Sequence, residues 1–188
     1  MKVKLKDIAN IQTGLFARTA SGGDVVYLKA KHFDQNGKLK TRLHPDLKLD
    51  SAAEKHLLKR GDVLYAAKGT KNFASWYESG NQPAVASTSF FVIRLTNNWS
   101  DKILPEFLVW SLNHPVTQRY LKGKAIGTAI VSISKSVLED TEISIPDIQI
   151  QKAVLKITQL RNTEIKLKDQ IETLREKQIQ QQILNGIK

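Results

Sequence analysis

The segment Gly61–Ala74, with the sequence GDVLYAAKGTKNFA, combines two glycines, two lysines and a threonine, as loops that bind phosphate often do. In a P-loop the lysine must follow the second glycine directly, because that lysine and the backbone amides together surround a triphosphate. Here Lys68 precedes Gly69, so the segment does not predict a nucleotide site. It favours a turn at Gly61-Asp62, then a core strand, then a loop whose donors suit a DNA backbone or base edge.

A second pattern has the letters of a nuclease site. Pro146-Asp147 precedes Glu164-Ile165-Lys166, which satisfies a PD…ExK motif. In such a site Glu164 and Lys166 share one face of a strand, but on a helix residues i and i+2 lie about 200° apart. Because these residues fall in a segment that predicts a long helix, a magnesium-dependent nuclease is the less favoured alternative.

The other catalytic residue types form no constellation that predicts an active site. The chain has no cysteine, and its four histidines include no i, i+4 pair of the kind that binds a metal on a helix. No serine lies in a G-x-S-x-G elbow, and no G-x-G-x-x-G is present. We therefore expect no catalytic residue, no metal site and no cofactor in this chain.

Charge gives the first positive indication of a partner. Lys plus Arg total 29 against 18 Asp plus Glu, which leaves a net charge of +11. From Tyr27 to Lys71, 11 basic residues stand against 5 acidic ones. A basic density of this kind favours a polyanion, most often a nucleic acid. The alternative is an evenly basic, solvated surface.

Three glycine-bearing basic loops alternate with predicted strands, which is how a scaffold presents adaptable contacts to a DNA groove. Besides the loop that contains Lys68, they are Phe16–Val26 and Tyr120–Ile130. We predict double-stranded DNA as the partner. The predicted contacts are Arg18, Lys68, Thr70, Lys71, Asn72, Lys122, Lys124 and Thr128 in the loops, and Lys29, Lys31 and His32 in or beside a strand.

Up to Pro146 the sequence is rich in predicted strands. Residues 24–33, 88–95 and 141–146 contain β-branched or aromatic runs that are bounded by turn-forming residues. Asn36-Gly37 between two of these runs predicts a tight turn.

Short helices are predicted among these strands. Residues 104–123 predict two of them, since Pro105 suits a first helical turn and His114-Pro115 interrupts the apolar periodicity. Ser136-x-x-Glu139 matches a capping box and predicts one more.

The C-terminal segment predicts one long helix. From Asp147, a plausible N-cap, to Asn185-Gly186, a plausible end, no proline or other glycine intervenes. With Ile150 as position a of a heptad, seven of ten a and d positions are apolar. At ~1.5 Å per residue the helix is roughly 57 Å long, more than its own domain can cover. We expect it to pair with a helix of another molecule through Ile150, Ile157, Leu160, Leu167, Ile171 and Leu174.

These patterns predict an α+β fold, with a strand-rich DNA target-recognition domain at residues 1–146 and a long helix for dimerisation and spacing at residues 147–188. A helix folded across its own domain is one alternative, and an interaction adaptor that uses only its coiled coil is another. No stretch approaches the ~20 apolar residues of a membrane span, and no signal peptide is evident. The absence of cysteine suits a reducing compartment, so we expect a cytoplasmic protein without a membrane partner.

Four stretches, in this order, resemble the DNA specificity (S) subunits of type I restriction-modification systems. They are KLKDIANIQTG (Lys4–Gly14), LKRGDVLYAAKG (Leu58–Gly69), PEFLVWSLNHPVTQRYL (Pro105–Leu121) and GTAIVSISKSVLEDTEISIPDIQIQKAV (Gly127–Val154). The resemblance covers essentially the full sequence and corresponds to one half of such a subunit. Full-length members carry two recognition domains and two long helices, whereas this sequence has one of each.

The resemblance implies a subunit that does not catalyse. Its recognition domain would read a few bases of a split site, and its helix would act as a spacer. Methyltransferase (modification) subunits would dock on it, bind S-adenosylmethionine and methylate adenine, and motor-nuclease (restriction) subunits would add cleavage.

The missing half points to a second polypeptide. A second copy, paired antiparallel through the helix, would restore the two-domain arrangement as a homodimer and make the target a palindromic bipartite sequence. A heterodimer with a different half subunit is one alternative, and a sequence that is a truncated piece of a full-length subunit is another.

Overall fold

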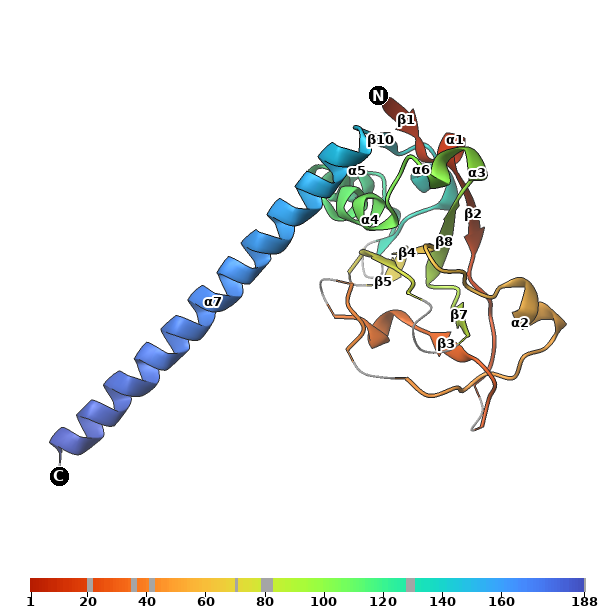
Figure 1. The fold of residues 1–188 in the computed structure, drawn as a ribbon. Helices are drawn as coiled ribbons and strands as arrows, with labels where there is room; N and C mark the ends of the chain where they lie inside the picture. Colours follow the sequence, from red (N-terminus) through yellow and green to blue (C-terminus); the bar gives the residue numbers. More distant parts are fainter. Residues whose placement is uncertain are drawn as a thin grey trace. The chain divides into compact units, whose positions relative to one another are not determined.

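The computed structural model describes residues 1–19, 22–34, 37–40, 43–69, 71–78, 83–127 and 131–187. The chain forms two compact units, Met1–Gln151 and Lys152–Lys188. The architecture is α+β, as the sequence predicts: strands and short helices build the first unit, and a single long helix continues through the second (Figure 1). In the described part of the chain, no helix is both long enough and apolar enough to span a membrane.

A four-stranded antiparallel sheet lies at the centre of the first unit. Its strands, in spatial order, are β2 (Ala9–Thr13), β8 (Phe90–Leu95), β4 (Val63–Ala66) and β6 (Ala74–Trp76). All four residues of β4 are buried, because both faces of the sheet are covered. Successive side chains of a strand point to opposite faces, so Val63 and Tyr65 join one apolar cluster and Leu64 and Ala66 join another.

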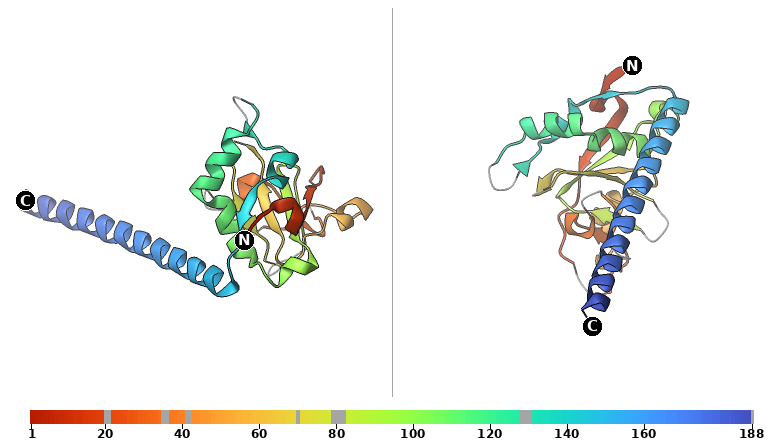
Figure 2. Two further views of the ribbon diagram at one scale, coloured as in Figure 1. Left: turned by 90° about the horizontal axis from the view of Figure 1, so that it is seen from above. Right: turned by 90° about the vertical axis from the view of Figure 1, so that its left-hand side faces the viewer.

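Two helices cover the first of these faces (Figure 2). They are α4 (Pro105–Asn113) and α5 (Pro115–Gly123). Leu108 and Leu121 are fully buried in the cluster that contains Tyr65. A proline at the first helical position needs no hydrogen-bond partner for its nitrogen, and Nδ1 of His114 accepts the N–H of Val116 at 3.4 Å between the helices. The prediction of two helices in this segment is confirmed.

The opposite face packs against an aromatic cluster. The rings of Phe33, Phe73 and Phe90 lie with centroids 5.6, 5.5 and 6.1 Å apart and meet at tilted or edge-on angles, which aromatic pairs favour. Next to this cluster, β3 (Val26–Leu28) runs parallel to β7 (Ala84–Ala86). The cluster thus joins three segments that are far apart in the sequence.

Two-stranded ribbons and short helical turns also belong to the first unit. The ribbons pair β1 (Lys2–Lys4) with β10 (Glu142–Ser144), and β5 (Lys68–Gly69) with β9 (Val131–Ser132). The helical turns are α1 (Leu5–Ile8), η1 (Ala30–His32), α2 (Ser51–Lys55), α3 (Asn97–Ser100) and α6 (Lys135–Glu139). Strand β10 confirms the strand predicted at residues 141–146.

Two local predictions are wrong in detail. The predicted strand at residues 24–33 is regular only in β3, because the N–H of Lys29 bonds to Nδ1 of His32 at 3.3 Å and the chain turns into η1. Helix α6 is capped by Ser134 and not by Ser136, since the Ser134 hydroxyl accepts the N–H of Val137 at 3.3 Å. Of the turn predicted at Asn36-Gly37, Asn36 lies outside the described residues, and Gly37 has φ +74°.

The long helix α7 (Ile148–Gly186) confirms the prediction for the C-terminal segment. Its first turn belongs to the first unit, which extends through Gln151. The side chain of Gln151 is fully buried there and makes three hydrogen bonds of 2.8–3.0 Å with the backbone of Lys102, Leu104 and Pro146. The second unit is the rest of this helix.

Candidate nucleic-acid interface

The Gly61-Asp62 turn supports the basic loop that follows β4 and does not itself suit a phosphate. Gly61 has φ +89°, a conformation that favours glycine. The carboxylate of Asp62 is buried, where it accepts hydrogen bonds from the Arg94 guanidinium at 2.7 and 2.6 Å and from the N–H of Lys59 at 2.8 Å. A carboxylate at this place would repel a phosphate, so the turn is not a phosphate site. Its hydrogen bonds to Arg94 and Lys59 instead hold the start of β4 in place.

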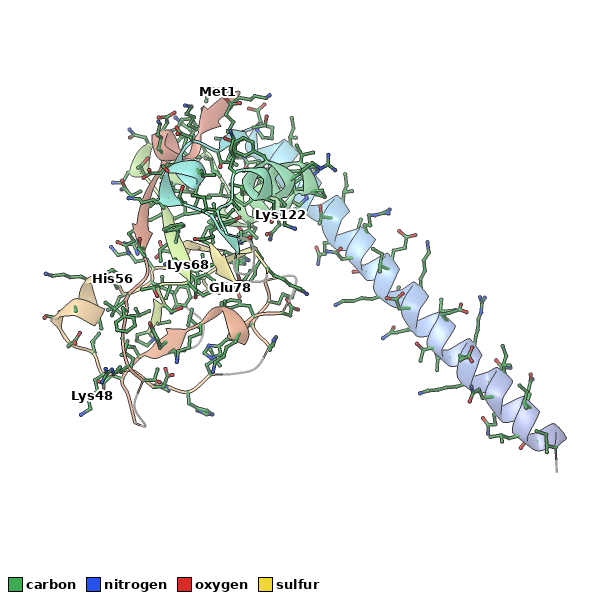
Figure 3. The ribbon with its side chains drawn as sticks, turned by 180° about the vertical axis from the view of Figure 1, so that it is seen from behind. Met1, Lys48, His56, Lys68, Glu78 and Lys122 are labelled. Carbon is green, nitrogen blue, oxygen red and sulfur yellow. The ribbon has the colours of Figure 1, made fainter. Side chains whose placement is uncertain are left out.

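The ribbon β5–β9 brings together two of the predicted DNA-contacting loops. Lys68 pairs with Ser132, and Ile126 forms a further bridge with Ser132, so the loop after β4 lies beside the loop after α5. Lys68 in β5 and Lys124 in the loop after α5 are exposed. Lys122 is exposed too, but it lies in the last turn of α5 and not in a loop, so its predicted placement is wrong. Figure 3 labels Lys68 and Lys122, which lie in adjoining parts of the first unit. The ribbon therefore gathers three cations from two distant segments.

The segment that follows β5 lies against η1. Phe73 contacts Phe33 with ring centroids 5.6 Å apart, and this contact sets the segment with Lys71 and Asn72 beside the turn that carries Lys31. Lys71 is exposed. The side-chain amide of Asn72 donates one hydrogen bond to the carbonyl of Ala66 at 2.9 Å and so closes the loop.

His32 and Lys29 are both half-buried, in contrast to the exposed Lys31. Burial, and secondarily the charge of Lys31, lowers the pKa of His32, so its imidazole is neutral at pH 7 and acts as a hydrogen-bonding group. The ammonium of Lys29 lies 5.1 Å from the ring centroid of Tyr27, within range of a cation–π contact. Lys29 thus keeps its charge but lies over the ring of Tyr27, whereas His32 offers hydrogen bonds and no charge.

Arg18 lies on a loop that Tyr27 ties to the same region. The Tyr27 hydroxyl donates to the carbonyl of Leu15 at 2.7 Å and accepts the N–H of Ala17 at 3.3 Å. Arg18 itself is exposed. Tyr27 therefore links the Arg18 loop to Lys29, which lies over the ring of this tyrosine.

Sequence reasoning missed one exposed aromatic residue of this loop. Phe16 is 79% exposed between two residues whose backbones Tyr27 holds. A phenylalanine in a glycine-bearing loop, with no large apolar residue at strand or helix spacing, was the signal that could have identified it. Of the remaining predicted contacts, Thr70 and Thr128 lie outside the described residues.

The six residues predicted to pair along α7 are exposed. The exposed fraction is 65% for Ile157, 57% for Leu160 and 64% for Leu174, and the others lie between 49% and 53%. Isolated apolar residues on a surface are ordinary, but a row of them at heptad spacing indicates a helix that pairs.

The geometry of α7 also bears on the nuclease alternative. Glu164 and Lys166 lie in the middle of the helix, and Glu164 forms an ion pair with Lys168 at 2.7 Å. Residues two apart on a helix point in different directions, so the strand geometry that a PD…ExK site needs is not present at these two residues. Among the described residues, no group of three or more His, Cys, Asp or Glu is placed to hold a metal ion.

The described residues thus form a strand-rich unit with exposed lysines on neighbouring segments, followed by a long helix with an exposed apolar seam. The family described as "Type I restriction modification DNA specificity domain" matches residues 1–184, so this chain belongs to that family. The resemblance inferred from the sequence is thereby confirmed. No curated protein matches the sequence.

Solved structures agree with this assignment at the level of the fold. The S subunit of a type I restriction-modification system from M. genitalium has 14% identity and a TM-score of 0.58 over 87% of this chain and 39% of its own. The HsdS subunit from Thermoanaerobacter tengcongensis has 13% identity and a TM-score of 0.61 over 88% and 38%. A structure that describes complex assembly and conformational transition of the type I R-M system has 14% identity and a TM-score of 0.59, over 88% of this chain and 38% of its own. The chain thus spans under two fifths of the length of each.

Proposed function

We propose that this chain is a DNA specificity component that reads one half of a bipartite site and does not itself catalyse. The observation that supports this most directly is the β5–β9 ribbon, which places Lys68 beside the loop of Lys124, just after the helical turn that carries Lys122, in a member of a DNA-specificity family. Lysines of this kind fix a protein on the phosphate backbone, while neighbouring polar groups read base edges. The chain would act in the cytoplasm, on the DNA that its partner subunits modify.

The catalytic chemistry in this proposal belongs to other subunits. Methyltransferase subunits that dock on the chain would bind S-adenosylmethionine and modify the DNA, and restriction subunits would add cleavage to the assembly. Support comes from the family and from the solved relative whose subject is assembly of a type I system. This chain would supply the DNA sequence preference and the spacing.

The second half of the site requires a second recognition unit. The chain spans 38–39% of the solved subunits, and the exposed seam of α7 gives it a surface for joining another helix. A second copy in an antiparallel homodimer would read a palindromic site, and pairing with a recognition unit of different sequence would give an asymmetric one. Both arrangements use the same seam.

A filter-binding salt titration of the purified chain tests the proposal against the coiled-coil adaptor. We expect binding to duplex DNA whose logarithm falls linearly with the logarithm of salt, with a slope of roughly −3 to −6 for several phosphate contacts. An adaptor would show no binding at low salt, and that result would contradict the proposed function. Incubation with plasmid and magnesium, without other subunits, should leave the DNA intact.

A further inference from the structure

Charge is distributed unevenly around α7. With Ile150 at heptad position a, positions e and g border the apolar seam, and positions b, c and f point away from it. The e and g positions hold five basic residues and no acidic residue. They are Lys156, Arg161, Lys168, Arg175 and Lys177, all exposed.

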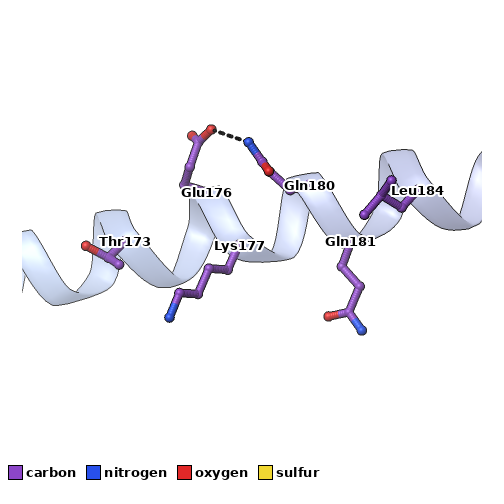
Figure 4. Close-up of a pocket in the computed structure, with 6 residues that line it drawn as sticks. All are labelled: Thr173, Glu176, Lys177, Gln180, Gln181 and Leu184. Carbon is purple, nitrogen blue, oxygen red and sulfur yellow. Dashed lines mark hydrogen bonds between the residues drawn. The ribbon is translucent and has the colours of Figure 1, made fainter.

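The acidic residues of the helix mostly lie away from the seam. Asp169 and Glu176 occupy f positions, and Glu172 occupies a b position. Figure 4 shows this arrangement at one place: Lys177 points to the same side of the helix as Gln181, a d position, whereas Glu176 points to the other side. There Glu176 accepts a hydrogen bond from Gln180 at 3.5 Å. Positive charge therefore borders the seam on both sides.

Ion pairs within the helix neutralise only part of this charge. Lys168 pairs with Glu164, the one acidic residue of the seam, at 2.7 Å, and Arg175 lies 3.8 Å from Glu172. Both pairs are exposed, and pairs of this kind are weak. Lys156, Arg161 and Lys177 have no ion-pair partner among the residues that the structure describes.

A second copy of the chain fits this border poorly. In an antiparallel pair of helices e positions face e positions and g positions face g positions, and in a parallel pair e faces g. In the register that aligns the two apolar seams antiparallel, Arg161 of one copy faces Lys168 of the other, and Lys156 faces Lys177. Like charges at these positions destabilise a pair of helices, whereas opposite charges stabilise it.

We propose that the seam of α7 is built for a partner helix whose own bordering positions carry Asp or Glu, in preference to a second copy of this chain. The inference rests on the proposed role of α7 as a pairing helix, and it specifies the chemistry of the partner. The basic border selects an acidic helix and at the same time disfavours the symmetric assembly. The second recognition unit then differs in sequence from this one, and the bipartite DNA target is asymmetric.

Fluorescence anisotropy of two labelled peptides, titrated with the full chain, tests this. Both peptides cover residues 148–187, one with the native sequence and one with five substitutions. The substitutions are Lys156→Glu, Arg161→Glu, Lys168→Glu, Arg175→Glu and Lys177→Glu, so that the apolar seam and the length are the same. At ~50 mM salt we expect the acidic peptide to bind about tenfold more tightly, and at ~1 M salt, where the Debye length is about 3 Å, we expect the difference to disappear.

The salt dependence of each peptide adds a second readout. Binding of the acidic peptide should weaken as salt rises, because screening removes an attraction. Binding of the native peptide should strengthen, because screening removes a repulsion. Equal affinities at low salt, or tighter binding of the native peptide, would overturn the proposal. A scrambled peptide with the composition of the acidic one should not bind. If it bound as tightly as the acidic peptide, net charge alone would explain the binding, and the proposal would be overturned as well.

Two charge-matched variants of the full chain locate the effect on the helix. Lys168→Glu with Arg175→Glu reverses two bordering charges, whereas Lys152→Glu with Lys166→Glu reverses two charges at outward c positions. Only the first pair should remove most of the advantage of the acidic peptide, and an equal loss in both variants would contradict the inference. DNA binding is measured on the same proteins. If it persists while the peptide preference is absent, the inference fails and the proposed function stands.

Discussion

Asp62 and Arg94 form a two-bond ion pair that holds the turn before β4 against β8. Nε and Nη2 of Arg94 lie 2.7 and 2.6 Å from the two carboxylate oxygens of Asp62. The side chain of Asp62 is 1% exposed and that of Arg94 is 33% exposed, so the pair lies at the edge of the core. Hydrogen bonding to Asp62 raises the pKa of the Arg94 guanidinium above its ordinary value. The pair supports the loop that carries Lys68.

Loss of Arg94 should destabilise the first unit. Arg94→Ala leaves a buried carboxylate without its cation, and we expect the free energy of unfolding to fall by about 2–3 kcal/mol, less than for a fully buried pair because water reaches the guanidinium. Arg94→Lys keeps the charge but loses the two-bond geometry, so its free energy of unfolding should lie between those of the parent protein and Arg94→Ala. Urea unfolding of the full chain measures both. A change below ~0.5 kcal/mol for Arg94→Ala would show that the pair does not hold the turn.

Gln151 should matter for stability far more than a neighbouring glutamine. Its side chain is fully buried and bonds to the backbone of Lys102, Leu104 and Pro146. Gln151→Leu keeps the approximate volume but leaves three backbone groups without these partners, which should cost about 2–3 kcal/mol. Gln149→Leu, at an exposed position of the same helical turn, is the matched control and should stay within ~0.5 kcal/mol. Equal effects in urea unfolding would count against the role given to Gln151.

Lys68 in the ribbon and Lys124 in the loop beside it should contribute to DNA affinity without contributing to sequence preference. For Lys68→Ala and Lys124→Ala we expect weaker binding on cognate and random duplexes alike, and a salt slope that is smaller by about 0.9 for each lysine removed. Lys48→Ala is the control, since Lys48 is exposed in a different part of the first unit (Figure 3). If either Lys68→Ala or Lys124→Ala lost binding to one sequence only, its assignment to phosphate would be wrong.

His32 should make the fold less stable as the pH falls. Its pKa is lowered in the folded chain, chiefly by burial, so the unfolded chain binds a proton more readily than the folded chain does. The contribution of His32 is therefore present above the ordinary histidine pKa of about 6.5 and is lost progressively as the pH falls through that value. Urea midpoints at pH 7.5 and 5.5 should differ less for His32→Gln than for the parent protein. If the midpoints differed equally in both proteins, a group other than His32 would cause the pH dependence.

Apolar periodicity made most of the elements predictable. The two helices on either side of His114, the strand at Phe90–Leu95 and the helix from Ile148 onward all bury or align residues at the period of the element they form. Gly61-Asp62 was correctly predicted as a turn before a core strand. Each of these features is determined by residues close together in the sequence, so its pattern can be recognised from the sequence alone.

The arrangement of the site depends on long-range contacts that no local pattern contains. The two-residue strands β5 and β9 are too short to show a period, yet their pairing is what brings Lys68 beside the loop of Lys124. The structural use of Asn72 likewise depends on the carbonyl of Ala66 being within reach across a turn. The neutral state of His32 depends on burial, which its lysine-rich neighbourhood in the sequence does not reveal.

The central claim is that this chain sets which DNA sequence a methyltransferase modifies. Methylation-aware sequencing of the genome, with and without the gene and in the presence of the methyltransferase subunits, measures this directly. We predict that removal of the gene abolishes adenine methylation at one motif of two short segments separated by a fixed gap, and that the same motif reappears when the gene is restored. A methylation pattern that is identical with and without the gene would contradict the account.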